Sequence, residues 1–220
     1  MRALNQAGAR LRRDIHNPPP LSARDFDGLR GGALVIDARP TEAYAKSHVP
    51  NSLSIPFRDA FALWLGWLVP KDTRLLFVTG DVSLERVLDE SLLVGYEQFG
   101  GVLEGGLRAW EAAGLPVATA QLVDASEARR WLLSGASALD VREPDEYQRG
   151  HVPDAIHVPL GQLAGRLDEI PRDRPVVAYC GHGERSSTAV SLLERAGCMI
   201  ALNLDGGMDA WRAAGYSAGT

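Results

Sequence analysis

The sequence predicts an α/β protein made of two tandem domains, each a mainly parallel β-sheet with helices on both faces. Two observations predict this fold: a repeat that covers most of the chain, and short apolar segments that alternate with helical ones inside each copy. A chain of 220 residues has room for one or two domains. Its hydrophobic content of 45% is ordinary for a folded protein.

The repeat is visible as two pairs of matching segments. Residues 37–57 (DARPTEAYAKSHVPNSLSIPF) align with residues 140–160 (DVREPDEYQRGHVPDAIHVPL) at an offset of 140 − 37 = 103. Residues 104–114 (EGGLRAWEAAG) align with residues 205–215 (DGGMDAWRAAG) at an offset of 205 − 104 = 101. The copies therefore differ by two residues in length, and we place this difference between Phe57 and Val69. Self-similarity of this extent indicates two domains of one fold.

The repeat also sets the expected domain boundaries. Three consecutive prolines, Pro18 to Pro20, favour an extended polyproline segment at the end of an N-terminal arm. The stretch LPVATAQ (115–121) is expected to be the linker between the copies. The predicted organisation is an arm or linker over 1–20, a first domain over 21–117 and a second domain over 121–220.

Within the second copy, apolar runs and helical patterns alternate. PVVAY (175–179) is a continuous apolar run, as in a parallel strand that is buried on both faces. A parallel sheet places its ligand site beyond the carboxyl ends of the strands. The expected strands are 137–141, 155–158, 175–179 and 199–204, and the expected helices are 143–148, 160–170, 186–196 and 208–214.

One loop at a strand end has the composition of a reactive site. Cys180 ends the apolar strand, and Arg185 and Ser186 open the next helix. Gly181 and Gly183 allow the tight backbone curvature that such a loop needs. Backbone N–H groups and the positive end of the helix dipole stabilise a thiolate at this position. The loop is therefore the predicted catalytic site.

These motifs resemble the rhodanese sulfurtransferase family over nearly the whole chain. The matching segments are CGHGERSS (180–187), DVR (140–142), Tyr147 with GHVP (150–153), and LDGGMDAW (204–211). The resemblance implies that Cys180 is the nucleophile and that it carries the transferred sulfur as a persulfide. It also implies that the loop residues Gly181, His182, Gly183, Glu184 and Arg185 bind the substrate. We add Ser186, at the start of the helix, and Arg142, at the rim of the site, to these substrate-binding residues.

The resemblance also indicates the reaction. The loop from Cys180 to Arg185 contains six residues, as in the sulfurtransferases, whereas related dual-specificity phosphatases have one more. A small phosphatase or arsenate reductase is thus disfavoured. The implied function is transfer of sulfane sulfur from thiosulfate, or from a low-molecular-weight persulfide such as glutathione persulfide, to a thiophilic acceptor. The alternative is a non-catalytic rhodanese-type binding or scaffold module of a sulfur-oxidation or sulfide-detoxification system.

Charges in the loop suggest which sulfur donor it uses. Glu184 stands beside Arg185, so the loop carries no net charge when His182 is neutral. A site for the thiosulfate dianion gains from excess positive charge, because a focused field concentrates the anion. We therefore expect a preference for persulfide over thiosulfate.

The first copy serves as an internal control. It has Thr79 where the second copy has Cys180, and Asp81 in the same loop would repel an anionic substrate. A threonine nucleophile needs an activating base, and none is evident nearby, so this copy is expected to be inactive. Residues that both copies share, such as His151 and Asp140, are expected to be structural. Cys198, next to a strand, is expected to belong to the core.

A further segment of the first copy, FRDAFALWLGWLVPKD (57–72), resembles part of tandem rhodanese regions that are fused to a metallo-β-lactamase-fold persulfide dioxygenase. The resemblance implies such a domain as a partner or fused domain, although its H-x-H-x-D-H motif does not occur in these 220 residues. The segment is apolar around its whole circumference. A helix of that kind is buried on more than one side, so it either packs between the two copies or docks to a missing domain or partner.

Composition excludes several other classes of function. A net charge of −5 gives no basic footprint for nucleic acid or an anionic membrane, and no apolar run is long enough to span a bilayer. The N-terminal arginines are not followed by the apolar stretch of a secretory signal. Two cysteines suit a reducing compartment, which predicts a cytoplasmic protein. The five histidines lack ligand spacing, so neither a metal nor a cofactor is expected.

Overall fold

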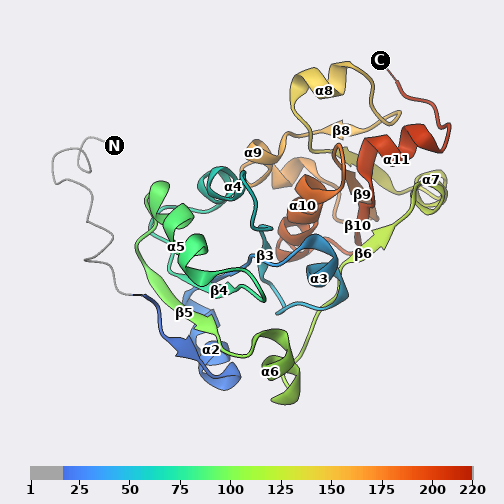
Figure 1. The fold of residues 1–220 in the computed structure, drawn as a ribbon. Helices are drawn as coiled ribbons and strands as arrows, with labels where there is room; N and C mark the ends of the chain where they lie inside the picture. The colour runs from blue at the N-terminus through green and yellow to red at the C-terminus, as the bar shows by residue number, and fades with distance from the viewer. Residues whose placement is uncertain (1–16, 220) are drawn as a thin grey trace.

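The structure is a computed structural model that describes residues 17–219. Most of the arm predicted over 1–20 therefore lies outside the described residues. Each copy of the repeat forms one five-stranded parallel sheet flanked by helices, as the sequence predicts, and the two sheets lie on opposite sides of a central group of helices (Figure 1).

The first sheet has the strand order β1-β5-β4-β2-β3, with every neighbouring pair parallel. Its strands are β1 Pro20–Leu21, β2 Leu34–Asp37, β3 Leu53–Ser54, β4 Leu75–Val78 and β5 Phe99–Leu103. The helices of this copy are α2 Ala23–Leu29, the 3₁₀ helix Arg30–Gly32, α3 Thr41–Lys46, α4 Phe61–Leu68, α5 Leu84–Leu93 and α6 Gly106–Ala112.

The second sheet repeats this order as β6-β10-β9-β7-β8, again all parallel. Its strands are β6 Gln121–Val123, β7 Ser137–Asp140, β8 Ile156–His157, β9 Val176–Tyr179 and β10 Ala201–Leu204. The helices are α7 Ala125–Leu133, α8 Pro144–Gln148, α9 Leu160–Leu163, the 3₁₀ helix Leu167–Glu169, α10 Glu184–Arg195 and α11 Gly207–Ala213.

Two local features differ from the expectation. The helix predicted over 160–170 is interrupted, because α9 ends in a turn at Gly165 and only a 3₁₀ turn follows; glycine is a poor helix former. The stretch taken as a linker is tied to the first copy, since His48 and Ala118 exchange both backbone hydrogen bonds. Its last residue, Gln121, is the first residue of the edge strand β6.

The strands are buried on both faces, and successive side chains enter different cores. In β9, Val176 and Ala178 face a central core, whereas Val177 and Tyr179 face an outer one. The central core contains residues of both copies, while the two outer cores each belong to one copy. The two sheets thus share one hydrophobic interior, into which every second side chain of their central strands points.

Helix α4 lies in this shared interior. Phe61 and Leu65 are fully buried in the central core, and a Cβ atom added at Gly161 of α9 would lie 3.0 Å from the Trp67 ring. Leu63 is half exposed. Of the two alternatives for this apolar helix, packing between the two copies is confirmed.

Between residues 17 and 219 the longest helix, α10, has 12 residues, and no helix combines the length and hydropathy needed to cross a bilayer.

Candidate functional site

Cys180 lies at the point where strand β9 gives way to helix α10. Gly183, the residue before α10, has φ +107°, a conformation that glycine adopts readily and other residues rarely do. This conformation lets the Gly183 N–H donate to Cys180 Sγ at 3.1 Å. The Cys180 side chain is nearly enclosed, with 2% of the residue exposed. The sulfur therefore sits at the amino-terminal end of a helix, where an anion is favoured.

A buried polar side chain on the neighbouring strand fixes this loop. The Ser186 hydroxyl lies 3.6 Å from Cys180 Sγ and donates to Asn203 Oδ1 at 2.6 Å. The Asn203 amide in turn donates to the Gly183 carbonyl at 2.9 Å. Asn203 is 1% exposed, so both hydrogen bonds form away from water. Asn203 was not singled out from the sequence. The difference between the copies was an available signal, because the first copy has Val102 at the equivalent position (203 − 101 = 102).

The amino-terminal end of α11 supports the loop by hydrogen bonds to its backbone carbonyls. The backbone N–H of Met208 donates to the Cys180 carbonyl at 2.7 Å, and that of Asp209 to the Gly181 carbonyl at 3.3 Å. Gly207 has φ +55°, and a Cβ atom there would lie 2.3 Å from the Cys180 carbonyl oxygen. The double glycine of the LDGGMDAW motif therefore permits the close approach of two backbones.

Arg185 is held at the loop by Glu146 of α8. Its Nη1 and Nη2 atoms donate to the two carboxylate oxygens at 2.6 and 2.8 Å. The hydrogen bond from Arg185 lowers the pKa of Glu146, and the carboxylate together with the nearby Cys180 sulfur raises the pKa of Arg185. Sequence reasoning did not single out Glu146. The repeat contained a signal, because the equivalents of this pair in the first copy are Ala43 and Leu84, neither of which is charged.

Arg142, which we expected at the rim of the site, is buried. Its Nη2 donates to Asp140 at 2.6 Å and to the Gly150 carbonyl at 2.9 Å, and the residue is 3% exposed. It still borders a pocket of about 480 Å³ that Gly181 and His182 also line. The remaining lining residues are Glu146, Arg149, Met208, Asp209 and Arg212.

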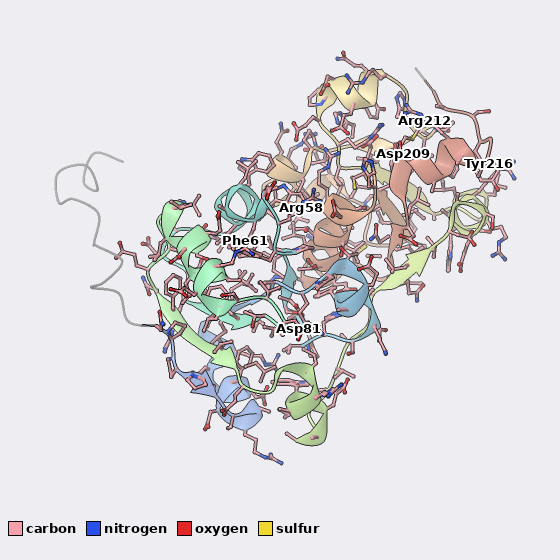
Figure 2. All side chains as sticks on the ribbon, in the orientation of Figure 1. Arg58, Phe61, Asp81, Asp209, Arg212 and Tyr216 are labelled. Atoms are coloured by element: carbon pink, nitrogen blue, oxygen red, sulfur yellow. The ribbon has the colours of Figure 1, made fainter. Side chains whose placement is uncertain are left out.

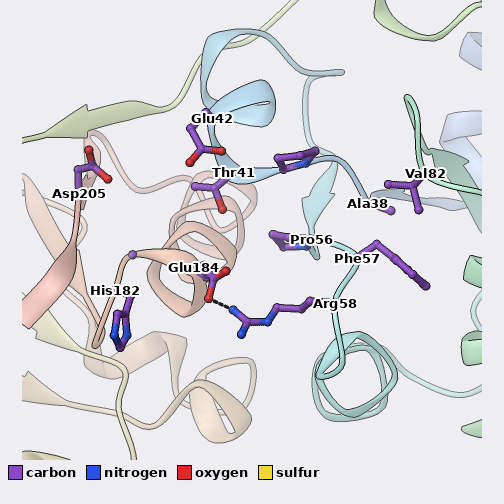
Figure 3. A pocket seen from close by; sticks show the side chains of 12 residues that line it. Ala38, Thr41, Glu42, Pro56, Phe57, Arg58, Val82, His182, Glu184 and Asp205 are labelled. Carbon is purple, nitrogen blue, oxygen red and sulfur yellow. Dashed lines mark ion pairs between the residues drawn. The ribbon is translucent and has the colours of Figure 1, made fainter.

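His182 and Glu184 have different charged partners, although both border the pocket between the copies. His182 is exposed and lies 3.2 Å from Asp209, whereas Glu184 forms an ion pair with Arg58 of the first copy. This second pocket, of about 200 Å³, lies between the copies and is bordered by Gly183, Glu184 and Arg58 (Figure 3). Glu184 is thus paired across the copies, while Arg185 has its own partner in Glu146.

The residues that both copies share have the same geometry in each. Tyr44 stacks on His48 and Tyr147 on His151, both with ring centroids 3.8 Å apart and planes 7° from parallel. The Asp140–Arg142 ion pair is matched by a pair at the same distance of 2.6 Å between Asp37 and Arg39 of the first copy. This repetition, in a copy without the cysteine, supports a structural role for these residues.

Cys198 has a different environment from Cys180. It is half-buried against the central core, with Sγ 3.6 Å from the Pro171 carbonyl. Burial raises the pKa of the Cys198 thiol, which disfavours the reactive thiolate.

The arrangement of the chain defines a class of protein: two parallel α/β domains in tandem, one of which has a cysteine at the amino-terminal end of a helix. Residues 22–113 and 120–214 match the rhodanese-like domain family. These two matches cover most of the chain, and the chain belongs to this family.

Two of the relatives match about a third of the chain each. The uncharacterized protein YqhL of Bacillus subtilis is 43% identical over 76 residues, which are 34% of this chain and 60% of that protein. A sulfurtransferase of Allochromatium vinosum is 44% identical over 73 residues, 33% of this chain and 68% of that protein. The match thus spans less than two thirds of the Bacillus protein. The crystal structure of a thiosulfate sulfurtransferase from Pseudomonas aeruginosa is 23% identical, with a TM-score of 0.38 over 91% of this chain and 43% of that one.

Proposed function

We propose that this protein is a sulfurtransferase that carries sulfane sulfur as a persulfide on Cys180. The observation that carries the proposal is the hydrogen bond from the Gly183 N–H to Cys180 Sγ at the start of α10. A backbone donor and a helix dipole both favour an anion on this sulfur. Membership of the rhodanese-like family, and the name of the Allochromatium relative, support a sulfurtransferase-type function.

The proposed reaction has two displacement steps. The Cys180 thiolate attacks the outer sulfur of thiosulfate, and the S–S bond of the donor breaks so that sulfite leaves with the electron pair. With glutathione persulfide as the donor, glutathione thiolate leaves instead. In the second step a thiophilic acceptor attacks the terminal sulfur of the persulfide, and Cys180 departs as thiolate. Neither step needs an external oxidant or reductant, so the proposed reaction requires no redox cofactor.

The loop supplies the proposed substrate contacts. In this proposal the backbone N–H groups of residues 181–185 bind the transferred sulfur. The Gly183 N–H donates to Cys180 Sγ, Ser186 lies beside this sulfur, and Glu146 orients Arg185. Arg142 borders the pocket on the Gly181 side, together with Arg149 and Arg212. We propose this pocket as the route for the anionic part of a donor, because Arg212 in its lining donates to the backbone carbonyls of Arg149 and Gly150 rather than to a carboxylate, and its charge is available to an anion.

Mass spectrometry of the intact protein tests the proposal directly. After incubation with thiosulfate or with glutathione persulfide, the wild type should gain the mass of one sulfur atom, and cyanide should remove it. Cys180→Ser should abolish the gain, whereas Cys198→Ser, the matched control, should leave it intact. A folded wild type that gains no sulfur from either donor would favour the alternative, a non-catalytic binding module.

Steady-state kinetics with both donors tests the finer prediction, a higher kcat/KM for persulfide than for thiosulfate.

The metallo-β-lactamase-fold partner implied by residues 57–72 stays a prediction. Helix α4 uses that segment to contact α9 of the same chain, through Trp67, and leaves Leu63 half exposed.

A further inference from the structure

We propose that the first domain supplies a specificity-determining residue to the loop of the second: Arg58, whose charge offsets Glu184 and sets how strongly the Cys180 site attracts anions. The inference rests on the proposed function only in naming the sulfur donor as the anion concerned. It gives the domain that has threonine in place of the nucleophile a direct part in the chemistry.

Arg58 lies between the two domains. It belongs to the segment that joins β3 to α4, and Figure 2 shows it on the side of the first domain that faces α10. Its guanidinium is 5.8 Å from the centre of the Trp64 ring, which is itself buried in the shared core. Glu184, its partner, is the first residue of α10 and directly follows Gly183, the residue that hydrogen-bonds Cys180 Sγ (Figure 3).

Other contacts hold this helix in place, so the position of Glu184 does not depend on the ion pair. The backbone N–H of Ser54 donates to the Ser191 hydroxyl at 3.0 Å, and His48 lies 3.5 Å from the Glu194 carboxylate. Near the end of α10, Arg195 donates to the Asn51 carbonyl. These contacts hold the carboxyl-terminal half of α10, and Asn203 holds Gly183 at its amino-terminal end, so we expect the helix to stay in position when the charge of Arg58 is removed.

The charge balance around the loop gives the two residues opposite effects. Arg185 is neutralised by Glu146 and Arg142 by Asp140, and His182 faces Asp209. Glu42 and Asp205 also border the pocket between the copies, but their charges are the same in every variant. Removing the charge of Arg58 therefore leaves the surroundings of the loop more negative and disfavours an approaching anion, whereas removing the charge of Glu184 leaves them less negative and favours it. Both side chains are more than one third exposed, 42% and 47%, so the effects should be modest and sensitive to salt.

The experiment uses the full chain in a Cys198→Ser background, so that Cys180 is the remaining thiol. Iodoacetate is an anion and iodoacetamide is neutral, but both lose iodide. The rate of alkylation of Cys180 by iodoacetate divided by the rate with iodoacetamide therefore reports the electrostatic potential at the sulfur. Glu184→Gln should raise the ratio roughly two- to fivefold, Arg58→Gln should lower it by a similar factor, and the double variant should return to the wild-type ratio. Moderate salt should shrink both changes.

The sign of the two single changes distinguishes this role from a structural one. A contact that only holds the domains together predicts that both variants shift the ratio in the same direction and that both lower the unfolding free energy. That result, or no shift in either variant, would overturn the proposal. Arg166→Gln, which breaks an exposed ion pair to Glu169 elsewhere on the second domain, is the matched control and should leave the ratio unchanged.

Thiosulfate turnover of the same proteins separates the two proposals. The values of kcat/KM should follow the alkylation ratio, highest in Glu184→Gln and lowest in Arg58→Gln. If the alkylation pattern appears but no persulfide forms on Cys180, the proposed function fails and the role of Arg58 stands. If persulfide forms and all four proteins share one kcat/KM for thiosulfate, the function stands and the role of Arg58 fails.

Discussion

Glu146 and Arg185 come from different elements, α8 and α10, and their ion pair places a fixed cation next to the sulfur. Both side chains are about three quarters buried. Charge-assisted hydrogen bonds in such surroundings are among the stronger polar interactions of a fold. The pair therefore contributes both to the stability of the second domain and to the orientation of the guanidinium.

Replacing Glu146 by Gln should lower the unfolding free energy by about 1–2 kcal/mol at neutral pH. Because Arg185 lowers the pKa of Glu146 in the folded state from its ordinary value of 4.5, the contribution of the charge is complete above that value. It is lost as the pH falls through the lowered folded value. Urea unfolding of both proteins, from neutral pH down to about pH 3, should show the difference shrinking in acid.

Glu169→Gln is the control, since Glu169 pairs with Arg166 at the exposed surface and should have little effect on stability. A difference between wild type and Glu146→Gln that stays constant down to strong acid would contradict the charge argument. It would mean that only the shape of the glutamate matters.

At the scale of elements, the loop is built where three of them meet. Strand β9 delivers Cys180, helix α10 supplies the amino-terminal end, and the start of α11 hydrogen-bonds the carbonyls of Cys180 and Gly181. The last contact brings two backbones so close that residue 207 has no room for a side chain. The glycine pair is thus a packing requirement of the Cys180 loop in the second copy.

Gly207→Ala should displace the loop and remove most sulfur transfer, because the added Cβ would lie 2.3 Å from the Cys180 carbonyl oxygen. Its equivalent in the first copy, Gly106, has a similar φ of +58° but open space around it. Gly106→Ala should therefore cost only the backbone strain, about 1–2 kcal/mol, and retain activity. Persulfide formation and unfolding free energies of both variants check this. Equal loss of activity in the two would show that strain, not the clash, is responsible.

At the scale of the molecule, the two domains are unequal partners around one core. Both sheets bury one face in the central cluster, so the first domain is needed for packing whether or not it has chemistry of its own. Its loop has lost the features that support the sulfur. The residues equivalent to Cys180, Gly183, Arg185 and Asn203 are Thr79, Val82, Leu84 and Val102.

Thr79→Cys in a Cys180→Ser background should therefore not restore sulfur transfer. The new thiol would stand at a strand end with Leu84 in place of the arginine and Asp81 nearby, so neither the thiolate nor an anionic donor would be favoured. Persulfide mass and turnover, compared with wild type, measure this. Activity close to that of the wild type would show that a cysteine at this position is sufficient in either copy.

The sequence by itself determined the two copies, the parallel α/β fold of each, most strand and helix positions to within about two residues, and the loop around Cys180. These features have local signals: a repeat, apolar runs, and glycines next to a cysteine at a strand end. The differences between the copies also predict that the first loop is inactive. The break at Gly165 was missed, because a single glycine within a helical pattern is an ambiguous signal.

Only the tertiary structure decided which charges meet. Glu146 forms an ion pair with Arg185, which lies 39 residues further along the chain. Asn203 donates a hydrogen bond to the Gly183 carbonyl, and Arg58 of the first domain pairs with Glu184 of the second. The local sequence around a charged residue does not specify its partner, because the partner is set by how distant elements pack. The shared core has the same origin, since the same apolar faces would suit two separate domains, and their burial against each other is a property of the assembled chain.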